Sequence, residues 1–228
     1  MKKITVIGAG TMGNGIAHVF AINGFDVMLF DINEKALAKS IINIEKNINR
    51  QISKELLTAD AGRSSLERIQ LVSNLEQAVT SADIVIEAAT ENESLKLQIF
   101  SSLSTLVSKE TILATNTSSI SIGKIAAVTK HPENVIGMHF MNPVPVMKLV
   151  EIISGYKTSE KTTAAITQLS KKLGKTPVAC NDYPGFVANR ILMPMINEAI
   201  ESLQNGVAGV SEIDSIMKLG MGHPMGCL

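Results

Sequence analysis

Gly8-Ala-Gly-Thr-Met-Gly13 follows a short apolar run at residues 3–7 and precedes apolar positions that recur at helical spacing from Thr11 to Asn23. The run predicts a strand and the spacing predicts a helix, so the glycines lie in the tight turn between them. Such a turn lets backbone amides approach a pyrophosphate, and the helix N-terminus adds its positive dipole. The stretch therefore predicts a dinucleotide-binding loop, made of Gly8, Gly10, Thr11, Met12 and Gly13.

A carboxylate follows at the position where this kind of fold binds ribose. Asp31 lies 18 residues beyond Gly13 and ends a second predicted strand at 25–30. There it can accept hydrogen bonds from the ribose hydroxyls of an adenosine, whereas a 2′-phosphate would face like charge. The sequence therefore favours NAD(H) over NADP(H) as the cofactor.

The rest of residues 1–183 continues this alternation of strands and helices. A long helix is expected from Asn33 to about residue 56. Apolar runs then predict strands at 84–88, 111–114, 135–139 and 149–153, with helices near 93–107 and 159–173. Because these runs are continuously apolar, we expect both faces of each strand to be covered. The prediction is an α/β fold with a Rossmann-type, doubly wound sheet. Residues 59–65 are expected to form a surface loop.

A change of pattern after Tyr183 predicts a second domain over residues 184–228. Residues 186–205 read as one apolar helix and residues 211–219 as another, which is the start of an all-helical domain. Two helices are too few to enclose a core, and the first domain can cover only part of a helix that is apolar on several sides. We therefore expect the region 186–220 to form a homodimer, or else to make the chain aggregate with low activity.

Composition narrows the classes of function. The 228 residues carry 21 basic and 21 acidic side chains, so no net charge attracts nucleic acid. No run approaches the roughly 20 apolar residues that span a bilayer, and glycines interrupt the apolar N-terminal segment, which argues against a signal peptide. Cys180 and Cys227 lack metal-binding spacing, so we expect no metal site and two free thiols in a reducing compartment. The cytoplasm is the expected location.

Two polar residues interrupt apolar strands. His139 ends the predicted strand at 135–139, the carboxyl end where open α/β sheets bind ligands, and Glu151 lies in the next apolar run. A carboxylate that accepts from one ring nitrogen would fix the imidazole tautomer, so that the other nitrogen can act as a base on an alcohol. Each residue alone is typical of a buried structural group, but after a dinucleotide-binding loop the two together predict a catalytic dyad.

Other polar residues have two interpretations. Asn116-Thr-Ser-Ser119 follows a predicted strand at its carboxyl end, where it could line a site or cap the next helix. Asn189 lies in the first apolar helix of the second domain, where a buried amide needs partners and could face a ligand. His18, His131 and His223 are expected on the surface or in loops.

Several longer segments, in one order, resemble the short-chain L-3-hydroxyacyl-CoA dehydrogenases, and most closely the bacterial 3-hydroxybutyryl-CoA dehydrogenases. They cover nearly the whole chain: VIGAGTMGNGIA at 6–17, IEAATE at 86–91, NTSS at 116–119, MHFMNPVPVMKLVE at 138–151, PGFVANR at 184–190, MKLG at 217–220 and HPMG at 223–226. Thr115 and Met141 stand where the family usually has Ser and Phe. The family continues for several helices beyond the position of Gly226, whereas this chain stops at Leu228.

The resemblance implies that an enzyme with NAD as its cofactor oxidises a short-chain (S)-3-hydroxyacyl-CoA to the 3-ketoacyl-CoA. It implies that His139 is the general base and Glu151 its orienting partner. It further implies that Ser118 and Asn189 hold the substrate oxygens. By the same matching, the cofactor would contact Glu91, Lys96, Ser118 and Asn142, and CoA would contact Asn47 and Lys54.

Two other functions remain open at this point. One is a hydroxyacid oxidoreductase similar to L-gulonate 3-dehydrogenase, which would need cations for a free carboxylate and no CoA contacts. The other is a catalytically silent NAD-binding protein. The basic residues Lys46, Arg50 and Lys54 recur every four positions on the predicted long helix, a face that suits the phosphates of CoA or is simply solvated.

Overall fold

An eight-stranded sheet organises the first of two units in the computed structural model, which describes residues 1–228. The first unit covers residues 1–182 and the second covers residues 183–228. The strand order is β3-β2-β1-β4-β5-β6-β7-β8. The strands are β1 (Lys3–Ile7), β2 (Asp26–Phe30), β3 (Ile69–Val72), β4 (Ile84–Glu87), β5 (Ile112–Thr115), β6 (Val135–Phe140), β7 (Leu149–Ser154) and β8 (Thr176–Asn181). The six strands β1 to β6 are parallel and have the Rossmann order, which confirms the predicted fold class.

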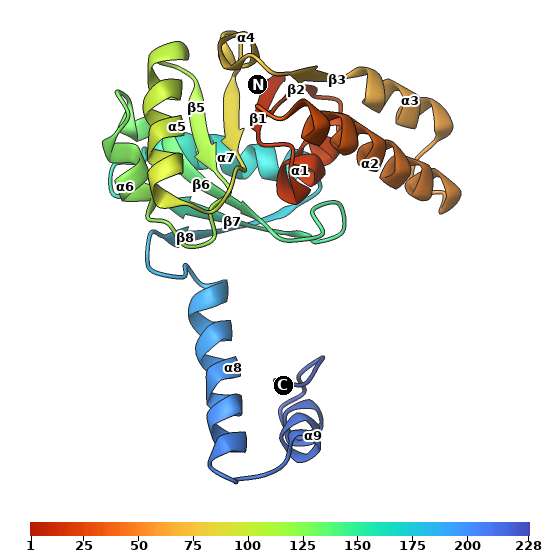
Figure 1. Ribbon diagram of the computed structural model, residues 1–228, viewed down its shortest axis with the longest axis vertical. Coiled ribbons are helices and arrows are strands. Elements are labelled where there is room, and N and C mark those ends of the chain that lie inside the picture. Colours follow the sequence, from red (N-terminus) through yellow and green to blue (C-terminus); the bar gives the residue numbers. More distant parts are fainter. The chain divides into compact units, whose positions relative to one another are not determined.

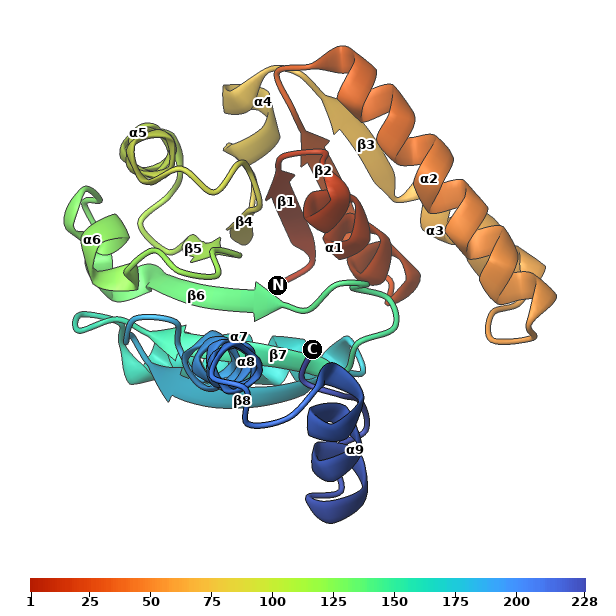
Figure 2. The same ribbon diagram turned by 60° about the horizontal axis from the view of Figure 1, so that its bottom comes forward.

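Helices cover both faces of this sheet. They are α1 (Thr11–Ile22), α2 (Glu34–Ser53), α3 (Ala59–Glu67), α4 (Leu75–Val79), α5 (Glu93–Leu106), α6 (Ile122–Ala127) and α7 (Glu160–Lys172). Figure 1 names the elements, and Figure 2 shows α1, α2 and α3 on the opposite side of β1 and β4 from α4 and α5. Side chains of α1, α2 and α7 share one core with the strands. The continuous apolar runs of the strands therefore reflect burial on both faces.

The strand β7 runs antiparallel to β6, unlike the strands before it. Only residues 141–148 connect the two strands, and a parallel pair needs a crossover of about a dozen residues or more, so the chain has to turn back. The reversal places His139 directly opposite Glu151 in the ladder. The chemistry predicted for this pair therefore depends on the short connection.

Residues 59–65 belong to a helix, so the expected surface loop is wrong. The helix α3 begins after Thr58, whose hydroxyl caps it by accepting from the Ala61 amide at 3.2 Å. Gly62, which resembles a helix breaker in the sequence, lies against α2. A Cβ there would lie 2.8 Å from Ile52 and 2.9 Å from Ile48. The glycine is therefore explained by close helix packing.

The expectation that His18 lies at the surface is also wrong. Its side chain is fully buried in α1. The helix contacts α2 and α3 as well as β1 and β2, so the face turned away from the sheet is covered too. Burial lowers the pKa of the His18 imidazole, which keeps the ring neutral at physiological pH. His131, by contrast, is exposed, as expected, and lies beside Glu133.

The second unit consists of α8 (Ala188–Gln204) and α9 (Val210–Gly220). The two helices meet at a small cluster of Ala199, Ile213 and Cys227. Large apolar side chains on both helices remain exposed, among them Ile191, Met193, Ile216 and Leu219. None of the helices in either unit has the length and apolar character of a membrane span.

Candidate active site

The loop between β1 and α1 requires glycine at two positions. Gly8 has φ +100°, in the region that L side chains rarely adopt, and a Cβ there would lie 2.7 Å from the carbonyl oxygen of Ala88. A Cβ at Gly13 would lie 1.7 Å from the carbonyl oxygen of Gly8, so this helix starts in contact with its strand. At Gly10 a Cβ would meet nothing within 4 Å. Glycine at position 10 is therefore not needed to avoid a clash within the protein, and the open space beside it can hold a ligand.

Asp31 ties this loop to the end of β2. Its Oδ2 accepts from the Ala9 amide at 2.8 Å and its Oδ1 accepts from the Asn33 amide at 2.9 Å. A carboxylate oxygen can accept more than one hydrogen bond, so both oxygens can also accept from ribose hydroxyls. A cavity of about 540 Å³ opens beside Asp31 and is lined by Gly8, Gly10, Ile32, Leu95 and Ile99, among others. An apolar cleft with one acid and an amide-rich loop fits the adenosine half of NAD.

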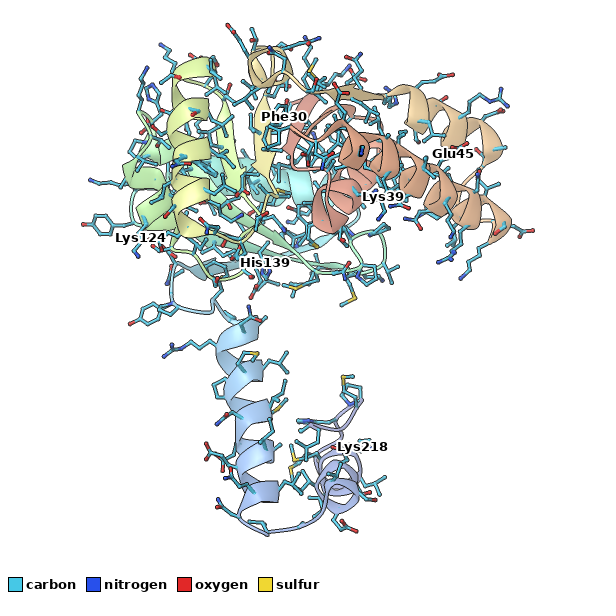
Figure 3. The ribbon with its side chains drawn as sticks, in the orientation of Figure 1. Phe30, Lys39, Glu45, Lys124, His139 and Lys218 are labelled. Atoms are coloured by element: carbon cyan, nitrogen blue, oxygen red, sulfur yellow. The ribbon has the colours of Figure 1, made fainter.

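His139 and Glu151 form a buried pair. The His139 Nδ1 and the Glu151 Oε2 lie 2.8 Å apart, and both side chains are almost inaccessible to solvent. With Glu151 ionised, Nδ1 carries the proton and donates to the carboxylate. In that tautomer Nε2 carries no proton, so it can accept a hydrogen bond. Figure 3 labels His139 in the lower part of the first unit as drawn.

The loop 116–119 is tied to the strand that carries His139. The Asn116 Oδ1 accepts from the Phe140 amide at 2.8 Å, next to His139. Sequence reasoning gave Asn116 no separate role, because its partner is distant along the chain. The contact fixes where the loop, and with it Ser118, lies relative to the imidazole.

Glu91 binds the other side of this loop. One oxygen, Oε1, accepts from the Thr117 hydroxyl at 2.6 Å, from the Ser118 amide at 3.0 Å and hydroxyl at 3.3 Å, and from the Ser119 hydroxyl at 2.9 Å and amide at 3.2 Å. Partial burial would raise the pKa of the Glu91 carboxyl. The hydrogen bonds from Thr117, Ser119 and Ser118, together with the charge of Lys96, hold that pKa below its ordinary value. The carboxylate therefore stays ionised at neutral pH, and its support of the loop is lost only as the pH falls through the lowered pKa.

Lys96 lies behind Glu91 with its side chain 1% exposed. Its Nζ donates to the Glu87 Oε1 at 2.7 Å and to the Ala89 carbonyl at 3.3 Å, and it lies 3.5 Å from the Glu91 Oε2. Sequence reasoning missed Glu87. This residue ends a buried strand just as Asp31 follows one, and its position at a carboxyl end was the available signal.

A second cavity of about 620 Å³ lies between the glycine loop, α2 and the connection after β6. Its lining includes Thr11, Asn47, Arg50 and Asn142 together with the exposed lysines Lys39 and Lys46. Three basic side chains and several amides give this cavity the chemistry to bind anionic groups. Lys54 is the C-cap of α2 and is not part of the lining. Figure 3 labels Lys39 on α2.

Asn189 lies in the first turn of α8, in the second unit, where its side chain is partly buried. It is the one residue of the predicted catalytic set outside the first unit. Within the first unit, the Asn116 contact joins the strand of His139 to the loop of Ser118, and Glu91 binds that loop. Asn142 lines the same cavity as Gly10 and Thr11 of the glycine loop.

Comparisons with known proteins give the family. The family model described as "3-hydroxyacyl-CoA dehydrogenase, NAD binding domain" matches residues 3–183, and the one described as "3-hydroxyacyl-CoA dehydrogenase, C-terminal domain" matches residues 185–228. The chain is 49% identical to the 3-hydroxybutyryl-CoA dehydrogenase of Bradyrhizobium diazoefficiens, covering 100% of this chain and 78% of that protein. It is 46% identical to the 3-hydroxybutyryl-CoA dehydrogenase of Clostridioides difficile, covering 99% of this chain and 80% of the relative.

A solved structure is also similar. The crystal structure of (S)-3-hydroxybutyryl-CoA dehydrogenase PaaH1 from Ralstonia eutropha superposes with a TM-score of 0.97 at 49% identity, covering 100% of this chain and 80% of that one. This chain therefore belongs to the 3-hydroxyacyl-CoA dehydrogenase family of oxidoreductases, and its first unit contains that family's NAD-binding domain.

Proposed function

We propose that the protein interconverts (S)-3-hydroxybutyryl-CoA and acetoacetyl-CoA with NAD as its cofactor and His139 as general base. The observation that carries this proposal is the buried pair of His139 and Glu151 at 2.8 Å, built at the carboxyl end of a sheet whose first turn is the dinucleotide loop. The short acyl chain rests on the named relatives, which are 3-hydroxybutyryl-CoA dehydrogenases.

In oxidation, the His139 Nε2 takes the proton of the substrate hydroxyl. At the same time, the hydrogen bonded to the carbon that carries this hydroxyl leaves as hydride. NAD+ supplies the hydride acceptor when bound. Glu151 accepts from Nδ1 throughout and stabilises the imidazolium that forms. In reduction, the imidazolium returns the proton to the developing alkoxide. Ser118 and Asn189 hold the substrate oxygens by hydrogen bonds, which orients the carbinol carbon for the transfer.

The experiment that tests this function measures NADH oxidation with acetoacetyl-CoA, acetoacetate and a long-chain 3-ketoacyl-CoA side by side. We expect acetoacetyl-CoA to have the highest kcat/KM. Equal turnover of acetoacetate would mean that the protein does not recognise CoA and would favour a hydroxyacid oxidoreductase. NADH binding without turnover of any of the three would mean that the protein is catalytically silent.

The basic cavity beside α2 is proposed to bind the phosphates of CoA. Arg50→Glu should raise KM for acetoacetyl-CoA about tenfold, because a charge-assisted contact becomes a repulsion, while KM for acetoacetyl-pantetheine stays near the parent value. Lys172→Glu, an exposed charge reversal on α7, is the matched control. An equal rise for both substrates after Arg50→Glu would count against a phosphate contact.

Asn47 and Lys54 are proposed as further CoA contacts, but the basic cavity supports only the contact of Asn47. Asn47 lines the basic cavity, whereas Lys54 lies beyond its edge. Lys54→Glu therefore measures how far the phosphate site extends along α2.

We propose that the protein works as a cytoplasmic homodimer through α8 and α9. The exposed apolar side chains of these helices support the dimer, and the two free cysteines support a reducing compartment. Sedimentation velocity at micromolar concentration tests the dimer. A stable, well-behaved monomer would contradict it.

A further inference from the structure

A buried lysine contacts the connection between β6 and β7. Lys175 lies directly before β8, and its side chain is buried. Its Nζ donates to the carbonyl oxygen of Val144 and, at 2.7 Å, to that of Met147. Both carbonyls belong to one turn, residues 143–147, in which the amides of Val146 and Met147 each donate to the first carbonyl of the turn at 3.0 Å. One side chain therefore ties two points of this turn to the start of β8.

The end of α7 fixes where Lys175 lies. Gly174 has φ +68°, the left-handed conformation that commonly ends a helix. Across this glycine, the Lys175 amide donates to the Ser170 carbonyl at 3.1 Å, as in a Schellman motif. The next amide, that of Thr176, donates to the Lys148 carbonyl at 2.8 Å, where β8 begins to pair with β7. The backbone of Lys175 is therefore held on both sides.

The ammonium of Lys175 has no acidic partner. Burial lowers the pKa of this ammonium, and no neighbouring carboxylate opposes the shift. Taking a charged lysine out of water costs free energy, and the lowered pKa means that hydrogen bonds to carbonyl oxygens do not offset that cost fully. A side chain that only filled space would not need the charge. Lysine at this position is therefore better explained by what its donors hold.

The turn 143–147 forms part of the wall of the basic cavity. Three of its residues line that cavity together with Asn142, which directly precedes the turn. Val144 is also buried against α1, where a Cβ at Gly15 would lie 2.8 Å from the Val144 Cβ. A shift of the turn would therefore move this wall of the cavity, and Asn142 with it.

We propose that Lys175 is a positioning residue: its two hydrogen bonds hold the turn 143–147, which keeps Asn142 and this wall of the basic cavity in place for the cofactor and CoA. The inference rests on the proposed function, through the expected contact of Asn142 with the cofactor and the binding of CoA in this cavity. Lys175 is not among the residues that line the cavity, so it acts through the backbone of the turn.

Two substitutions separate a role of the donors from a role in packing. Methionine has about the size of lysine but no donor, whereas arginine is larger and keeps a charged set of N–H donors. If the hydrogen bonds matter, Lys175→Met should disturb the turn more than Lys175→Arg. If only packing mattered, the order would be reversed. Should Lys175→Met not fold, Lys175→Gln, with an uncharged donor on a shorter side chain, takes its place with the same expected order.

The matched control is Lys172→Met. It makes the same change at an exposed lysine in the last turn of α7, three residues earlier in the chain. We expect its turn 143–147, its NADH affinity and its kinetics to match those of the parent, because an exposed lysine contributes little to its surroundings.

The readouts are hydrogen exchange of the turn, the Kd of NADH and KM. In Lys175→Met, the amides of Val146 and Met147 should exchange about tenfold faster or more, because the turn in which they are bonded has lost its anchor. The Kd of NADH and KM for acetoacetyl-CoA should each rise about tenfold in this variant. In Lys175→Arg both should stay within about threefold of the parent.

A double-mutant cycle with Asn142→Ala tests how the effect reaches the cofactor. In a protein that already lacks the Asn142 amide, Lys175→Met should raise the Kd of NADH by no more than about twofold. The reason is that the two changes remove one contact, so their effects do not add.

Exchange of Val146 and Met147 at the parent rate in Lys175→Met would overturn the proposal. So would a milder effect of Lys175→Met than of Lys175→Arg, or additive effects in the cycle. Hydrogen exchange and NADH binding need no turnover. A parent protein that does not reduce acetoacetyl-CoA would therefore defeat the proposed function while leaving these two measurements intact.

Discussion

His139→Gln will lower kcat for acetoacetyl-CoA reduction by roughly 10²- to 10⁴-fold, the range that a positioned general acid or base contributes. Glutamine keeps a polar side chain of similar reach but cannot carry the proton at neutral pH. The proposed contacts of the adenosine half of the cofactor are the glycine loop and Asp31, which this change does not touch, so the Kd of NADH should stay within about threefold of the parent. Stopped-flow kinetics and NADH fluorescence measure the two effects separately.

Glu151→Gln is the companion variant, and we expect it to lose less activity than His139→Gln. The glutamine oxygen can still accept from the His139 Nδ1, so the tautomer is retained while the charge that stabilises the imidazolium is lost. If His139→Gln retained activity within a few-fold of the parent, His139 could not be the base. If Glu151→Gln lost more than His139→Gln, its main role would be to hold the two strands together, because the two residues are paired in the ladder.

The sequence predicts the parallel part of the fold because its signals are local. The glycine loop, the apolar runs and Asp31 each follow from neighbouring residues, and the strand order is then set by right-handed crossovers. The direction of β7 could also have been predicted, since the connection over 141–148 is too short for a crossover. The strands β3 and β8 and the helices α3, α4 and α6 were missed. Their sequences are partly polar or contain glycine, and tertiary packing decides their structure.

Only part of the candidate site, too, could be predicted from the sequence. His139 and Glu151 could be predicted because each interrupts an apolar strand. Glu87 and Glu91 are separated by four residues, which in a helix would place them on one face, but one ends a strand and the other lies in the turn that follows. Their convergence on Lys96, and that of Asn116 on the Phe140 amide, joins segments distant in sequence. Such contacts leave no periodic pattern, so spacing cannot reveal them.

Gly13→Ala and Gly10→Ala each add one methyl group to the glycine loop, but they should affect different properties. We expect Gly13→Ala to lose stability and Gly10→Ala to lose affinity for NADH. At Gly13 the new Cβ would lie 1.7 Å from the carbonyl oxygen of Gly8. Because this oxygen belongs to the backbone, the clash can be relieved only if the helix moves away from the strand. Separating α1 from β1 would disrupt the core that both share, at a cost of about 4 kcal/mol or more out of a typical stability of about 5–15 kcal/mol. We expect this variant to be largely insoluble or to unfold at a much lower Tm.

At Gly10 the methyl group meets no protein atom within 4 Å, so Gly10→Ala should fold with a Tm within a few degrees of the parent. The methyl group would instead occupy the space through which the loop amides approach the pyrophosphate, and the Kd of NADH should rise about tenfold or more. Thermal unfolding and NADH titration of both variants check the pair. Parent-like NADH affinity in Gly10→Ala would mean that the pyrophosphate does not pass over Gly10. A stable Gly13→Ala protein would mean that α1 can move away from β1 without loss of the core, and that the close contact does not hold the loop in its binding conformation.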